Sequence, residues 1–143
     1  MAITSAICTS FKVEILKGVH AFTASSGNTF NLALYTSSAS LGAATTAYTT
    51  SNEVSGSGYT AKGNALTSVT PVADSTTAVC DFADTSFTSA SFTARGCMIF
   101  NDSATGDPAV CVIDFGSDKT VTSGTFTIQF PAADASNAIV RIA

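Results

Sequence analysis

The strongest pattern in the chain is an alternation of apolar and polar residues over positions 123–131. Phe126, Ile128 and Phe130 occupy every second position, with hydroxyl or amide side chains between them. A period of two is typical of a β-strand with one buried and one solvated face. A glycine opens the pattern and Pro131 closes it, as is common at strand boundaries. We therefore predict a strand whose three apolar side chains lie in the core, at the centre of the fold.

A second clear strand is predicted over residues 29–36, where Phe30, Leu32 and Leu34 share one face and are expected in the core. Further short apolar segments predict strands over residues 64–70, 77–83, 87–92, 93–100, 109–115 and 137–142. This number and spacing indicate a mainly β chain. We expect an antiparallel β-sandwich or jelly-roll-like barrel of about eight strands, forming a single domain over residues 1–143.

Turn-forming residues predict where these strands end. Pro71 is expected to stop the strand that begins at residue 64, and Gly96 predicts a bulge or a close backbone approach. Residues 101–108 (NDSATGDP) carry the strongest turn signal, so the strands on either side are predicted to form a hairpin. Residues 116–123 are predicted to be a loop before the strand described first.

One helix is predicted, over residues 4–17. Ile7, Phe11 and Ile15 recur every four residues and form an apolar stripe. The side chain of Thr4 or Ser5 can cap the N-terminus of the helix. Gly18 can supply the left-handed turn that ends it. So short a helix is not stable alone, so we expect the stripe to dock on the sheet or on a neighbouring subunit. The stripe residues are therefore candidate interface residues.

Residues 37–63 lack strong periodicity and are rich in Ser, Thr, Ala and Gly. Tyr48, Val54 and Tyr59 are isolated anchors within this long segment. An ordered segment of this length without regular structure is usually functional or partner-facing. We therefore predict a long partner-facing loop region, with these three anchors as candidate interface residues.

The composition limits the function. Only 11% of the 143 residues are charged, the net charge is −4, and the six Lys and Arg residues are scattered. Nucleic-acid binding, which needs a concentrated basic patch, is therefore not expected. A surface poor in charge is weakly protected against association, which suggests that a partner covers part of it. Because the chain shows neither a membrane-length apolar run nor a signal-peptide pattern at its start, we expect synthesis in a cytoplasm and no membrane partner.

Chemical motifs are scarce. His20 is the single histidine and, just past the predicted helix, reads as a packing or helix-end residue rather than a general base. Four widely spaced cysteines lack a C-x-x-C motif and are expected to be free buried thiols, although a disulfide of unknown pairing would become possible in an oxidising exterior: Cys8, Cys80, Cys97 and Cys111.

Other candidate chemistry is equally weak. Two pairs of aspartates could supply acid–base chemistry, Asp81 with Asp84 and Asp114 with Asp118, but they are more simply strand-end or outward-facing residues. Residues 101–107 are better explained as a hairpin turn than as a calcium-binding loop. No phosphate loop, zinc cluster or nucleophile motif is present. The sequence therefore predicts a binding or structural module, not an enzyme, with no cofactor and no metal.

Several motifs resemble those of small virion proteins of tailed bacteriophages. The similarity extends over nearly the whole chain. The motifs that carry it are SFK at 10–12, LKGVH at 16–20, FNLALYT at 30–36, NEVSGSGY at 52–59, ARG at 94–96, DFGSDK at 114–119 and the strand at 123–131. The resemblance implies a structural virion protein and supplies no catalytic residue. Within that class, the small size, acidity, low charge and β-rich body with one amphipathic helix favour a capsid decoration (cement) protein in the phage head. Its partner, implied by the resemblance, is the major capsid protein, and we expect a homo-oligomer, most simply a trimer that matches the symmetry of the shell.

Two alternatives are kept. A tail, neck or baseplate component would need a similar β module. A glycan-binding module for host attachment would use exposed aromatic rings, for which Tyr48 and Tyr59 in the long loop region are the candidates.

Overall fold

The computed structural model describes residues 2–143. It shows a mainly β chain with two antiparallel sheets and one short helix, arranged in a sandwich-like way and not closed into a barrel. The predicted fold class is thereby confirmed. The elements, in chain order, are β1 (Ala6–Ile7), α1 (Thr9–Leu16), β2 (Phe30–Tyr35), β3 (Asn64–Ala65), β4 (Ser68–Asp74), β5 (Thr77–Phe82), β6 (Thr85–Asn101), β7 (Ala109–Ile128) and β8 (Val140–Ile142).

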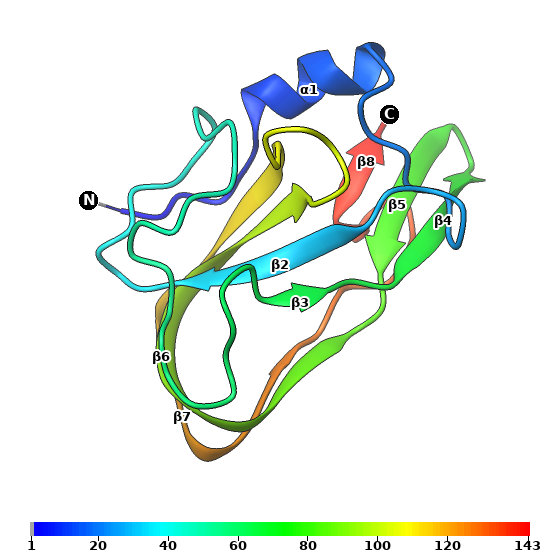
Figure 1. Cartoon of the computed structure of the whole chain (residues 1–143). Coiled ribbons are helices and arrows are strands. Elements are labelled where there is room, and N and C mark those ends of the chain that lie inside the picture. The colour runs from blue at the N-terminus through cyan, green and yellow to red at the C-terminus, as the bar shows by residue number, and fades with distance from the viewer. Residues whose placement is uncertain (1) are drawn as a thin grey trace.

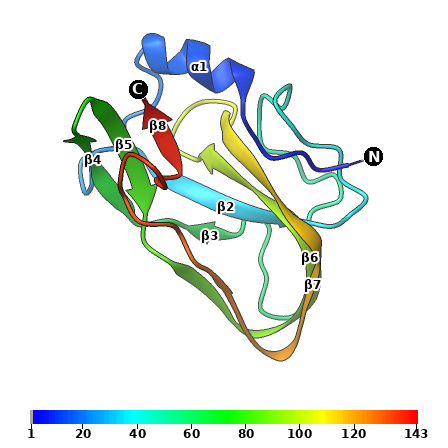
Figure 2. The same cartoon turned by 180° about the vertical axis from the view of Figure 1, so that it is seen from behind.

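The larger sheet has the strand order β1-β7-β6-β2-β3, and the smaller one the order β4-β5-β8 (Figure 1). Seen from behind, the smaller sheet lies at the same end of the molecule as the C-terminal end of α1 (Figure 2). Strands β6 and β7 form one long, strongly bent hairpin. Its turn is the predicted one, because Phe100 pairs with Ala109 across it.

Strand β7 is longer than the sequence predicts. The expected loop at 116–123 belongs to it, with Lys119, Thr120 and Val121 paired to β6. This part of the hairpin is a largely exposed two-stranded ribbon, so it needs no alternation of apolar residues. Threonine is β-branched and fits an extended backbone, so a Thr- and Ser-rich stretch can form a strand without the pattern that sequence reading seeks.

The predicted strand at 64–70 is divided into β3 and β4, and Pro71 lies within β4 rather than ending it. The pairing of β4 with β5 shifts register between Val69 and Val72, which places Pro71 in a bulge. Strand β4 is also an edge strand of its sheet. The N–H that proline lacks is therefore not needed for a ladder hydrogen bond.

The helix is shorter than predicted and begins at Thr9, with Cys8 at its N-cap. The preceding residues instead form β1, in which Ala6 pairs with Val112 and Ile7 with Cys111. The open edge of β7 offers these residues backbone partners that a first helical turn would not have had. The end of the helix follows the prediction, because Gly18 has a φ of +72°.

The core is organised around β2. Phe30, Leu32 and Leu34 have no exposed surface, and neither do Ala33 and Tyr35 from the opposite face. Strand β2 is thus buried on both faces, not on one as its alternation suggested. The reason is that both faces are covered: the rings of His20 and Phe22 stack on Phe30 on one side, and on the other side Tyr35 donates to the carbonyl oxygen of Thr49 in the 37–63 segment.

Gly96 occupies the crowded position that the sequence predicts. The register between β6 and β7 shifts between Ala94 and Gly96. A Cβ atom built on Gly96 would lie 2.5 Å from the carbonyl oxygen of Ile113 and 2.9 Å from Cδ1 of Ile3. Only glycine allows the backbone and Ile3 to approach this closely.

Candidate functional site

The predicted core residues of the last part of β7 border an open groove. Phe126, Ile128 and Phe130 are half-buried against the core and line an apolar groove of about 560 Å³. The remaining lining residues come from β6, from the rest of β7 and from the segment after it: Cys97, Ile113, Phe115, Lys119, Thr127, Gln129, Pro131 and Ile139. We call this the β7 groove.

The sheet also ends at this part of β7. Strand β1 pairs only with Cys111 and Val112. Within residues 2–143, no strand pairs with the outer edge of β7 beyond that point. The alternation at 123–131 therefore marks the rim of the core rather than its centre, which corrects the prediction.

The anchors of the 37–63 segment point inward. Val54 is buried, and its backbone N–H donates to the carbonyl oxygen of Leu34 at 2.9 Å. Tyr48 stacks on Phe100 with ring centroids 4.7 Å apart. These residues bind the segment to the fold, so they present little surface to a partner, contrary to the prediction.

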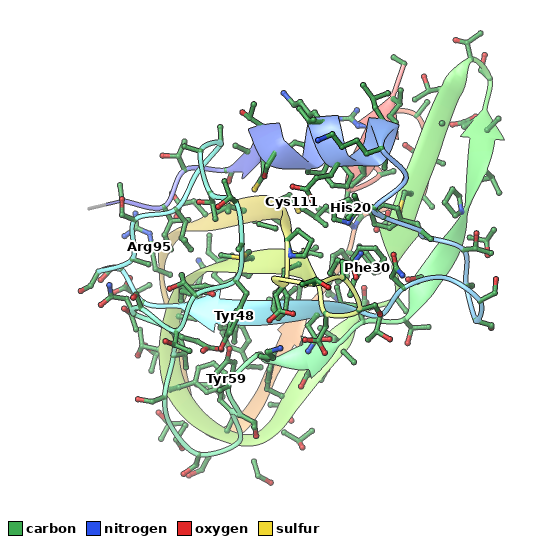
Figure 3. The ribbon with its side chains drawn as sticks, turned by 45° about the horizontal axis from the view of Figure 1, so that its top comes forward. His20, Phe30, Tyr48, Tyr59, Arg95 and Cys111 are labelled. Carbon is green, nitrogen blue, oxygen red and sulfur yellow. The ribbon has the colours of Figure 1, made fainter. Side chains whose placement is uncertain are left out.

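Tyr59 behaves in the same way. Its ring packs against Phe87 and Phe92, with centroids 5.5 and 5.9 Å away. Its hydroxyl accepts from the backbone N–H of Leu34 at 2.9 Å. Figure 3 shows Tyr59 and Tyr48 on the side of the sheet that the 37–63 segment covers.

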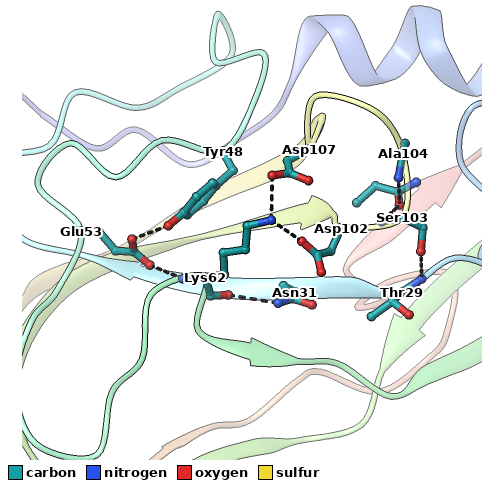
Figure 4. A network of polar contacts seen from close by, with 10 residues as sticks. Thr29, Asn31, Tyr48, Glu53, Lys62, Asp102, Ser103, Ala104 and Asp107 are labelled. Carbon is teal, nitrogen blue, oxygen red and sulfur yellow. Dashed lines mark hydrogen bonds and ion pairs between the residues drawn. The ribbon is translucent and has the colours of Figure 1, made fainter.

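Glu53 is the centre of a polar network in this segment (Figure 4). Tyr48 and Tyr59 each donate a hydroxyl to one of its carboxylate oxygens at 2.6 Å, and the backbone N–H of Lys62 donates at 2.8 Å. Burial, followed by the hydrogen bond to Glu53, raises the pKa of Tyr48 to about 12. Because both oxygens are occupied, Glu53 acts as a structural acceptor and not as a free base.

Lys62 connects this network to the turn between β6 and β7. Its ammonium group lies 2.7 Å from Asp102 and 2.9 Å from Asp107, and hydrogen bonds to these carboxylates raise the pKa of Lys62. The same group lies 5.7 Å from the centroid of the Tyr48 ring. Sequence reading missed this site, although Glu53 and Lys62 are the two charged residues of a long neutral segment.

The predicted stripe of α1 faces the chain's own core. Phe11 is buried, and its ring lies 4.9 Å from His20 and 5.9 Å from Phe22. Ile15 is partly buried against the same cluster, and Ile7 lies in β1. Of the two docking partners that were expected, the sheet and a neighbouring subunit, the stripe contacts the sheet. Phe11 therefore offers no surface to a neighbouring subunit.

His20 is a buried packing residue. Nε2 lies 2.8 Å from Glu14 Oε2, and Asn101 lies 3.2 Å from Nδ1. The ring lies 6.1 Å from the ring of Phe30, and both are labelled beneath α1 in Figure 3. Both ring nitrogens are engaged within the chain, so His20 has no free nitrogen with which to accept a substrate proton.

All four cysteines are free and buried. Burial raises the pKa of Cys8 to about 11 and that of Cys80 and Cys97 to about 12, and it raises the pKa of Cys111 as well. They are therefore neutral thiols at physiological pH, without the thiolate that a nucleophile or metal ligand requires. Within residues 2–143, no three His, Cys, Asp or Glu side chains are close enough to hold a metal ion.

One end of the β7 groove is acidic. Asp84 accepts from the backbone N–H of Phe130 at 2.7 Å. Burial raises the pKa of Asp81, whereas hydrogen bonds from Phe82 and Ile139 lower it, and Asp134 and Asp84 are near enough to raise it further. Asp84 and the buried Asp81 thus lie beside the Phe130 and Ile139 end of the groove without lining it, and Lys119 is the one charged residue among the lining side chains.

The other aspartate pair is tied to a cation. Arg95 Nε lies 3.0 Å from Asp114, and Arg95 Nη1 lies 3.8 Å from Asp118. The backbone N–H of Gly116, followed by Arg95, lowers the pKa of Asp114. This carboxylate is ionised and paired, so it is unsuited to acting as a general acid.

Comparisons with protein-family models, curated proteins and solved structures found no match to the chain. Nor does any helix within residues 2–143 have the length and apolar character needed to cross a bilayer.

Proposed function

We propose that this protein is a structural component of a tailed-phage virion, namely a decoration protein that binds the assembled head and stabilises it. The observation that carries the proposal of a component of a larger assembly is the β7 groove, where side chains with the alternation of a core strand remain half-exposed. A surface of this kind is normally covered by another protein chain. The resemblance to phage virion proteins supports a virion component with the major capsid protein as its partner, and the small size and low charge of the chain favour the head as the location.

The 37–63 segment is the surface that we assign to the shell. Its inner residues are held by the Glu53 and Lys62 network, while Ser55 and Thr60 are exposed. A segment that is already ordered loses little conformational entropy on binding. If its contact spans two neighbouring capsid subunits, it favours the assembled shell over free subunits and stabilises it by mass action.

The other readings have less support. Glu53, His20 and the four thiols are each engaged or neutral, so a catalytic role has no obvious base or nucleophile. The rings of Tyr48 and Tyr59 pack against phenylalanines, which removes the feature that favoured glycan binding. A neck or baseplate location is distinguished from the head by copy number. A tail-tube location, which also implies hundreds of copies, is distinguished by whether the protein stays with isolated heads.

The copy number is measured by quantitative mass spectrometry of purified particles of the source phage, with the major capsid protein as the internal standard. A decoration protein is expected in hundreds of copies, made in the host cytoplasm and retained on the head. Six or twelve copies would move the protein to the neck or baseplate, and its absence from the particle would overturn the proposal.

The shell contact is tested by adding purified protein to heads that lack it. The Ser55→Glu/Thr60→Glu variant introduces two buried charges at the proposed contact and is expected to lose binding. The matched control is Thr122→Glu/Thr125→Glu, which changes two exposed residues of β7. Equal binding by both variants would contradict the assignment of the 37–63 segment. Deleting residues 2–17 is a poor test, because Cys8 and Phe11 belong to the core.

A further inference from the structure

Helix α1 has a second apolar face that points away from the core. Leu16 is 89% exposed and Val13 is 50% exposed. At 3.6 residues per turn these two side chains share one side of the helix, opposite Phe11 and Ile15. A leucine exposed to this extent has no role in the packing of its own chain, so this face is available to another molecule.

This outer face is positively charged. Lys12 and Lys17 flank the two apolar side chains, and neither forms an ion pair within the described part of the chain. The one acidic residue of the helix, Glu14, is turned toward His20. The face therefore fits a partner surface that combines an apolar recess with carboxylates.

The β7 groove of the same protein has both properties. Its walls are formed by Phe126, Ile128 and Phe130, and its volume of about 560 Å³ leaves room for two aliphatic side chains. Asp84 lies at its Phe130 end, where it accepts from the backbone N–H of Phe130, and Lys119 is the one charged residue that lines the groove itself. No residue of α1 lines the groove, so the two surfaces are separate on one chain.

We propose that the outer face of α1 docks into the β7 groove of a second copy of this chain. Val13 and Leu16 enter the groove, and whichever of the two flanking lysines lies on the side of the Phe130 end approaches Asp84. The inference rests on the proposed function and extends it, because this contact would build the oligomer that sits on the head. It is heterologous, so repeated head-to-tail contacts close into a ring, such as the expected trimer, if the rotation between copies allows it.

The test begins with the mass of the purified full-length protein, measured by sedimentation equilibrium over a range of concentrations. A multiple of the 14.4 kDa chain mass is expected for the wild type. Leu16→Asp places a carboxylate in the apolar contact, and Gln129→Arg places a cation and a long side chain in the groove. Each variant alone is expected to lose the oligomer and sediment as a single chain.

Mixing the two variants identifies the contact. Leu16→Asp retains an intact groove and Gln129→Arg retains an intact helix face, so a head-to-tail contact restores a dimer in the mixture. A contact between two helix faces or between two grooves would restore nothing, and that outcome overturns the proposal. A wild type that sediments as a single chain also overturns it. So does a single-chain protein that binds anionic lipid vesicles through Leu16, because the outer face of α1 would then contact a membrane surface.

The controls separate loss of contact from loss of fold. Leu16 and Gln129 are exposed, so both variants are expected to keep the wild-type circular dichroism spectrum and melting temperature. Val72→Asp makes the same kind of change at an exposed valine of β4 and should leave the oligomer intact. Because these measurements need no phage heads, failure here leaves the copy-number test of the proposed function unaffected.

Discussion

The side-chain amide of Asn101 donates to Nδ1 of His20 across a distance of 3.2 Å. The orientation of the amide is set by the turn, because its oxygen accepts from the backbone N–H groups of Ser103 and Ala104. Nδ1 is therefore an acceptor, and Nε2 carries the proton that is donated to Glu14 at 2.8 Å. Two residues that are 81 positions apart thus link the end of α1 to the turn between β6 and β7.

The first prediction concerns Asn101, whose side chain is fully buried and also donates to Asn28 at 3.0 Å. Asn101→Ala leaves several buried polar groups without partners, so we expect a loss of about 3 kcal/mol in the free energy of unfolding. Urea denaturation measures this loss. Thr105→Ala, an exposed change in the same turn, should cost less than about 0.5 kcal/mol. Similar costs for the two variants would show that the network contributes little.

The second prediction concerns Glu53. In Glu53→Ala the hydroxyls of Tyr48 and Tyr59 lose their carboxylate acceptor, and we expect a loss of about 2–4 kcal/mol. The effect should be local as well as global, because the backbone N–H of Lys62 also loses its acceptor. Hydrogen exchange is expected to become faster across the 37–63 segment, while β6 and β7 keep their relative protection. Ser51→Ala, at an exposed neighbouring position, is the control, and uniform exchange changes in Glu53→Ala would contradict a local role.

The third prediction is a loss of stability at alkaline pH. Burial raises the pKa of the Cys97 thiol from 9.0 to about 12. A folded pKa above the unfolded one means that the native state holds its proton more tightly. The resulting stability is fully present below pH 9 and is lost as the pH rises toward 12, by roughly 1.4 kcal/mol per pH unit for each such thiol. Cys8 and Cys80 act in the same direction.

The measurement is the urea midpoint of the wild type at several values between pH 7.5 and 10.5, at constant ionic strength. The midpoint should fall above pH 9, and Cys97→Ala should show a shallower fall even though its cavity makes it less stable at neutral pH. A parallel fall in both proteins would rule out Cys97 as a contributor.

The fourth prediction tests the crowding at Gly96. A methyl group at this position would lie 2.5 Å from the carbonyl oxygen of Ile113, so Gly96→Ala should force β6 and β7 apart. We expect a cost of about 1–3 kcal/mol, measured by thermal or urea unfolding. Gly42→Ala is the matched control, because the nearest atoms to its added methyl group are 3.8 Å away. Equal stability of the two variants would refute the close approach.

The sequence by itself determined the elements that depend on local pattern. The alternation in residues 29–36 identified β2, the cluster at 101–108 identified the hairpin turn, and Gly96 identified a crowded point between strands. These features are readable because a strand period and a turn conformation are properties of a few neighbouring residues.

Only the tertiary structure decided which side of each element meets another. The start of α1 depends on the β7 edge that pairs with Ala6 and Ile7, and the role of Glu53 depends on tyrosines brought in by the fold. The alternation at 123–131 could not show that its strand borders a groove, because the same pattern suits a fully and a half-covered face. Whether a strand face is buried depends on residues that are distant in the sequence, whereas periodicity shows only that the face is apolar.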